Sequence, residues 1–100
     1  QAIADIAAAR AAYAQALRLL ELTSAMADDQ RTRLQSSERA FEAGASDRLA
    51  LLAARLEAST AESARIEALL EAHRAAGQLE TALRQPLPSA SPASISKGQP

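Results

Sequence analysis

Apolar side chains recur every three or four residues along most of the chain, and this spacing predicts two long helices. We expect the first helix over residues 2–43 and the second over residues 47–84. Spacing by threes and fours is typical of the seam of a coiled coil, where one helix packs along another. In the first segment the seam is imperfect because charged side chains lie on it. Its positions are Ile3, Ile6, Arg10, Tyr13, Leu17, Leu20, Ser24, Ala27, Arg31, Leu34, Glu38 and Phe41.

The second segment carries two stripes on different faces of the expected helix. The first stripe comprises Leu49, Leu52, Leu56, Ser59, Ser63, Ile66 and Leu70. The second stripe comprises Leu51, Ala54, Ala58, Ala61, Arg65, Ala68, Ala72, Ala75, Leu79 and Ala82. A hairpin gives each helix one neighbour, so the spare stripe predicts further helices, from other chains or from other parts of the same chain.

Residues that end one helix and begin the next lie between the two segments. Gly44 suits the position just after a helix end, where the backbone is left-handed. Asp47 or Ser46 can then cap the next helix by accepting hydrogen bonds from its free N–H groups. Residues 44–46 are therefore predicted to form a turn that reverses the chain.

The composition supports an all-α fold. Hydrophobic residues make up 48% of the chain but aromatic residues only 2%, and alanine is the most frequent residue. Alanine and leucine are strong helix formers, and β-branched residues are too scarce here for strands. Gly77 is expected opposite Tyr13, where it would make room for the ring; the alternative is a kink in the second helix. We predict a long antiparallel two-helix coiled-coil hairpin over residues 1–84, followed by a disordered Pro- and Ser-rich tail over residues 85–100.

Charge and motif content argue against several kinds of function. The formal net charge is −1, with 11 basic and 12 acidic residues interspersed, so the sequence gives no electrostatic support for nucleic-acid binding. No apolar run approaches the length of a membrane-spanning helix. His73 is the single histidine, and we expect it to be a surface or inter-helix residue rather than a metal ligand. We predict no catalytic residues, no metal and no cofactor, because two helices cannot enclose an ordinary substrate.

The turn resembles the second periplasmic hairpin turn of the outer-membrane efflux (TolC) family. In that family an aromatic residue precedes the glycine by three positions, and a short polar loop leads into a hydrophobic cluster. The string FEAGASDRLALL shares that arrangement through Phe41, Gly44, Leu49, Leu51 and Leu52. The opening QAIADI with YAQAL after it, and the ending AAGQLETALRQPL, resemble the start and close of the family's last two long helices. The resemblance covers roughly residues 1 to 87.

The resemblance implies a segment of a periplasmic duct in the outer membrane of a Gram-negative bacterium. Family members are homotrimers whose helices form an α-barrel below a β-barrel, and the strands of that β-barrel would precede Gln1. Their turns dock a periplasmic adaptor protein. On this resemblance the partner-binding residues are those of the turn, namely Phe41, Gly44, Ala45, Ser46, Asp47, Arg48 and Leu49. The acidic residues that often narrow the family's duct entrance are replaced here by Ala50 and Ala53, so no gating residue is assigned.

The alternative is a self-associating coiled-coil module, a scaffold or dimerisation unit that assembles into a four-helix bundle. A pair of helices lying on a lipid surface would need basic polar faces and aromatic anchors, and the sequence has neither.

Overall fold

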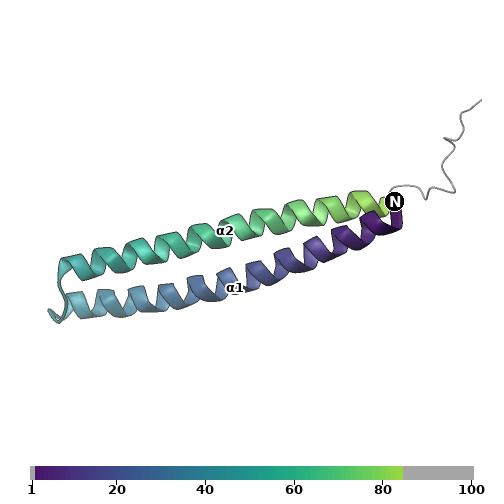
Figure 1. The fold of residues 1–100 in the computed structure, drawn as a ribbon. Coiled ribbons are helices and arrows are strands. Elements are labelled where there is room, and N and C mark those ends of the chain that lie inside the picture. The colour runs from purple at the N-terminus through teal and green to yellow at the C-terminus, as the bar shows by residue number, and fades with distance from the viewer. Residues whose placement is uncertain (1, 85–100) are drawn as a thin grey trace, which may run out of the picture.

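The chain folds into an antiparallel hairpin of two long helices, which confirms the predicted all-α class (Figure 1). A computed structural model describes residues 2–84. Helix α1 spans Ala2–Glu42 and helix α2 spans Arg48–Arg84, against predicted ranges of 2–43 and 47–84. The 41 residues of α1 give a rod of about 61 Å. The predicted disordered tail, residues 85–100, lies outside the described residues.

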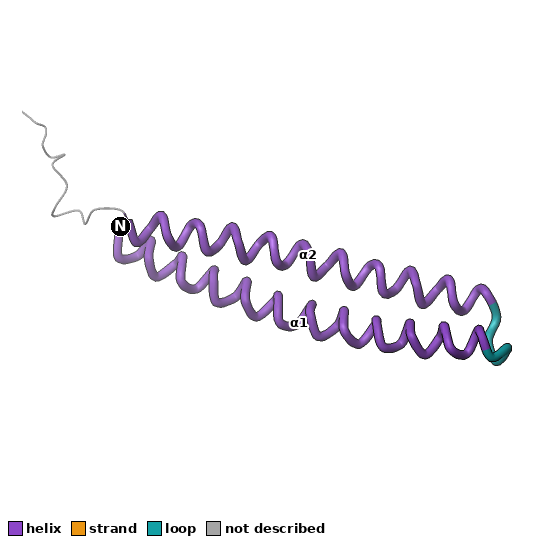
Figure 2. The backbone as a smooth tube through the Cα atoms, turned by 180° about the vertical axis from the view of Figure 1, so that it is seen from behind, coloured by secondary structure: helices purple, strands orange, loops and turns teal. Residues whose placement is uncertain are grey.

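The two helices lie side by side along their whole length and are joined by one short turn (Figure 2). No described helix is both long enough and apolar enough to cross a lipid bilayer.

The second predicted stripe of α2 is the face that packs against α1. Every member of this stripe is buried or half-buried. The fully buried members are Leu51, Ala68, Ala72, Ala75 and Ala82. We call this face the inner stripe of α2.

Only part of the predicted seam of α1 faces α2. Ile6, Tyr13, Leu20, Ala27 and Leu34 face α2 as expected, since each is buried or half-buried. The other expected positions are mostly wrong, because Ile3, Arg10, Leu17, Arg31 and Phe41 are exposed. The other residues of α1 that face α2, between those five, are Ala9, Ala16, Thr23, Gln30 and Ser37, and each is buried or half-buried. Small or uncharged polar side chains occupy these places, between larger ones such as Tyr13 and Leu20.

The tightest packing lies in the half of the hairpin that carries the chain ends. There Ala16, Ala72 and Ala75 form a buried cluster, with Tyr13 and Leu20 packed against it. Methyl groups at facing positions let two helix backbones approach closely. They also contribute little apolar area each, because hydrophobic stabilisation scales with the area removed from water.

The first predicted stripe of α2 faces away from α1. Its members lie two residues from those of the inner stripe, a step of about 200° around a helix, and all of them are exposed. We call this face the outward stripe of α2. It comprises Leu49, Leu52, Leu56, Ser59, Ser63, Ile66 and Leu70.

Gly77 does not make room for the Tyr13 ring, so that expectation is wrong. Gly77 is exposed, and a Cβ atom built there would meet nothing within 4 Å. It follows Leu70 by seven residues and therefore continues the outward stripe, so the space beside it is open to a neighbour outside the hairpin.

Ala75→Leu tests the close approach of the two helices. Ala75 is 2% exposed, and a larger side chain would force the backbones apart at a cost of about 1–3 kcal/mol. We expect a lower urea midpoint, followed by circular dichroism, for this variant than for the unsubstituted chain. Ala53→Leu is the matched control because Ala53 is exposed on the same helix. Equal midpoints for the two variants would contradict the alanine seam.

Candidate functional site

The turn begins with a glycine in the left-handed conformation. Gly44 has φ of +78°, as the sequence predicted, and this backbone conformation is costly for residues with a Cβ atom. The Gly44 N–H donates to the Phe41 carbonyl at 3.0 Å, and the Ala45 N–H donates to the Ala40 carbonyl at 2.8 Å. These two bonds form a Schellman motif, which satisfies carbonyls that the end of α1 leaves without partners. The backbone conformation, rather than crowding, therefore requires glycine here.

Asp47, rather than Ser46, caps the second helix. Its Oδ1 accepts a hydrogen bond of 2.8 Å from the Ala50 N–H, three residues along, which is the geometry of an N-cap. The hydroxyl of Ser46 makes only a long 3.5 Å contact with the Asp47 carbonyl. Glycine and aspartate thus fix both sides of the reversal within four residues.

The predicted partner-binding residues lie together at the tip. Gly44, Ala45, Asp47 and Arg48 are exposed and Ser46 is half-buried. Two large apolar side chains flank them, since Phe41 is 39% exposed and Leu49 is 75% exposed. The tip is therefore a compact polar loop with one apolar side chain on each helix.

Arg48 is the charged group of the tip that is best placed to meet a partner. The Asp47 carboxylate is already engaged in the cap of its own helix. Arg48 is exposed, and no salt bridge in the described part of the chain includes it.

The outward stripe is a second candidate surface, and it reaches the tip through Leu49 and Leu52. Its large members include Leu56 at 68% and Leu70 at 59% exposure. The sequence pattern revealed this stripe, but our predicted site residues covered only its tip end. An apolar row of this length, along a helix whose other face is already packed, is a surface suited to another helix.

Helix α1 also exposes large apolar side chains, some of them spaced by three and four residues on one face. Leu19, Leu22 and Met26 are the large ones in its middle. They lie among charged groups that pair along the same helix, for Asp28 binds Arg31 and Asp29 binds Arg33, each at 3.1 Å. These are two of the intrahelical pairs that the spacing favours, and exposed pairs of this kind contribute little to stability.

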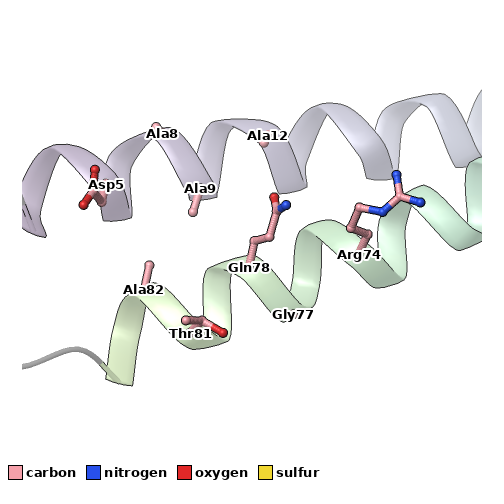
Figure 3. Close-up of a pocket in the computed structure, with 9 residues that line it drawn as sticks. All are labelled: Asp5, Ala8, Ala9, Ala12, Arg74, Gly77, Gln78, Thr81 and Ala82. Atoms are coloured by element: carbon pink, nitrogen blue, oxygen red, sulfur yellow. The ribbon is translucent and has the colours of Figure 1, made fainter.

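A groove of about 770 Å³ lies near the open end of the hairpin (Figure 3). Alanine side chains from both helices line it, and Asp5 and Arg74 stand at its opposite ends. Gln78 points across it toward α1. The groove is a shallow, open trough lined in part by alanine side chains.

His73 lies on a different flank, beside Tyr13 and Ala76. It is exposed, as expected for a surface or inter-helix histidine. Among residues 2–84 no three potential ligands gather into a metal site.

In comparisons with known proteins, no family model, no curated protein and no solved structure matches the chain. The resemblance to the efflux family therefore stays a prediction that rests on the turn residues and on the order of the motifs around them.

Asp47→Ala tests the cap at the tip. Loss of the bond to the Ala50 N–H should destabilise the hairpin by about 1 kcal/mol, measured as a lower thermal midpoint. Ser46→Ala is the control, because Ser46 lies beside Asp47 but makes no cap bond, and its midpoint should be unchanged. A larger loss for Ser46→Ala would show that the cap has been assigned to the wrong residue.

Proposed function

We propose that this hairpin is one segment of the periplasmic α-barrel of an outer-membrane efflux duct. The observation that carries the proposal is the pair of stripes on opposite faces of α2. The inner stripe packs on α1, while the outward stripe exposes leucine and isoleucine along most of the same helix. A helix in the wall of a barrel has a neighbour on each side, and α2 has a packing face for each.

The dimensions of the hairpin support a wall rather than a globular unit. Two single-layer helices of about 60 Å form a slab one helix thick, with no third layer in the described chain. Alanine side chains make up much of the seam, with larger ones such as Tyr13, Leu20 and Leu34 between them, so the hairpin buries only a thin core. Its large apolar residues are placed where neighbouring helices of a homotrimer would cover them.

The tip supports a docking role at one end of the wall. Its backbone is fixed by Gly44 and Asp47, which leaves the exposed groups Phe41, Arg48 and Leu49 in defined positions. In the proposed duct these groups contact a periplasmic adaptor protein, and the turn residues from Phe41 to Leu49 form the docking site. The duct carries its cargo without a cofactor, and its outer-membrane strands lie elsewhere in the protein.

A self-associating scaffold is the second candidate, and the same outward stripe favours it. A four-helix bundle of two hairpins would cover the stripe without any duct. The scaffold has no need of a docking surface at the tip, so the two functions differ in what a change at the tip does.

The deciding experiment alters the tip in the full-length protein. Gly44→Val places a β-branched residue at positive φ, which costs about 1 kcal/mol or more. The helices on each side are held by their own seam, so we expect the trimer to reach the outer membrane. We expect susceptibility of cells to drugs or metals to increase, because the adaptor meets a distorted turn.

Gly44→Asn is the matched control, because asparagine tolerates the left-handed conformation better than other non-glycine residues. It should retain most of the resistance. Normal resistance with Gly44→Val, at normal amounts of surface trimer, would contradict the docking role. A change in stability with no transport phenotype would favour the scaffold.

A further inference from the structure

The middle of the hairpin seam contains no large apolar side chain. Between Leu20 and Leu34 on α1, the residues that face α2 are Thr23, Ser24, Ala27 and Gln30. The residues opposite, on α2, are Ala58, Ala61, Glu62, Ala64 and Arg65. We call this section the polar belt. It separates the packed cluster near the chain ends from the seam near the tip, where Leu34 and Leu51 are enclosed.

A buried polar atom lies at the tip-side end of the belt. The side-chain Oε1 of Gln30 is shielded from solvent and has no hydrogen-bond partner, and it is the one such side-chain atom in the described chain. An unsatisfied buried acceptor loses its hydration without a replacement, which is a destabilising arrangement. This acceptor therefore weakens the contact between the helices at this level, although Ala27 beside it is buried.

Side-chain hydrogen bonds also compete with the backbone of α1 at the belt. The Thr23 hydroxyl donates to the carbonyls of Leu19 and Leu20, at 2.9 and 3.1 Å. The Thr32 hydroxyl donates to the Asp28 carbonyl at 3.1 Å. Threonine bonds of this kind bend helices and weaken them slightly. They bracket the Gln30 position on both sides.

The charged groups of the belt pair along each helix rather than across the seam. The Arg65 Nε donates to both carboxylate oxygens of Glu62 at 3.2 Å. Arg65, with a smaller effect from Arg31 across the seam, holds the pKa of the Glu62 carboxyl below its ordinary value. Both residues of the pair are partly exposed, so their charges remain hydrated and replace little of the missing apolar contact.

We propose that the polar belt is a hinge at which the two helices separate locally, while the seam on each side of it stays closed. Such a hinge would let the tip half of the hairpin change its angle to the half that carries the chain ends. The inference rests on the seam and is independent of the proposed duct, so it holds equally for a scaffold.

Hydrogen exchange of the full chain, followed by mass spectrometry, tests the hinge. Local opening gives faster exchange in the segment that opens. We expect a minimum of protection at residues 23–30 and 58–65, with slower exchange both nearer the tip, around Leu34 and Leu51, and around Ala16 and Ala75. Protection that changes steadily from one end of the hairpin to the other would overturn the proposal, as would uniformly fast exchange.

A paired substitution tests the cause of the opening. Gln30→Leu removes the unsatisfied acceptor and adds apolar contact, so exchange within the belt should slow about tenfold. The flanking segments should change much less. Gln35→Leu is the control, because Gln35 is exposed on the same helix, and it should leave the belt unchanged. Equal slowing by both variants, or slowing by Gln30→Leu spread evenly over both helices, would overturn the assignment of the hinge to Gln30.

Discussion

The close approach of α1 and the alanine stripe of α2 is the contact on which the rest of the hairpin depends. Buried methyl groups at Ala16, Ala72 and Ala75 bring the two helices together. Each methyl removes only a small apolar area from water, and stabilisation follows that area. Larger side chains such as Tyr13 and Leu20 also lie in this seam, but the leucine and isoleucine side chains of the outward stripe stay exposed. The hairpin therefore leaves the large apolar side chains of the outward stripe of α2 uncovered.

Residues of the turn itself, rather than packing in the seam, determine where the chain reverses. Gly44 ends α1 through its left-handed backbone and Asp47 begins α2 through its carboxylate. Both effects are local, so the tip keeps its form without help from packing. A tip of fixed geometry at the end of a thinly packed hairpin is suited to contacting a partner. The polar belt lies between the packed cluster near the chain ends and the tip, where the turn adds its own hydrogen bonds to the seam.

Much of this arrangement follows from the sequence because it rests on local signals. The helices come from the three- and four-residue spacing, the turn from Gly44 and Asp47, and the two faces of α2 from its stripes. The inner face of α1 could not be predicted as well. Spacing alone favoured Leu17 and Arg31 at positions that the structure gives to Ala16 and Gln30, because the facing helix decides how much room a side chain has.

Two further features depend on the partner helix and were beyond single-sequence reasoning. Gly77 was predicted to face Tyr13, but the rotation of α2 about its axis turns it outward. The buried Oε1 of Gln30 is visible only once the two helices are placed together. The residues of the tip lie together because a turn brings together residues that are adjacent in sequence, and that they bind a partner stays a prediction.

We expect the outward stripe to pack against a neighbouring helix, and sedimentation equilibrium of the chain tests this expectation most directly. Leu70 and Leu83 are similarly exposed on α2, at 59% and 53%, but only Leu70 belongs to the stripe. We expect association that increases with concentration. Leu70→Gln should weaken this association, and Leu83→Gln should retain it. A folded monomer at every concentration, or equal effects of the two substitutions, would contradict it.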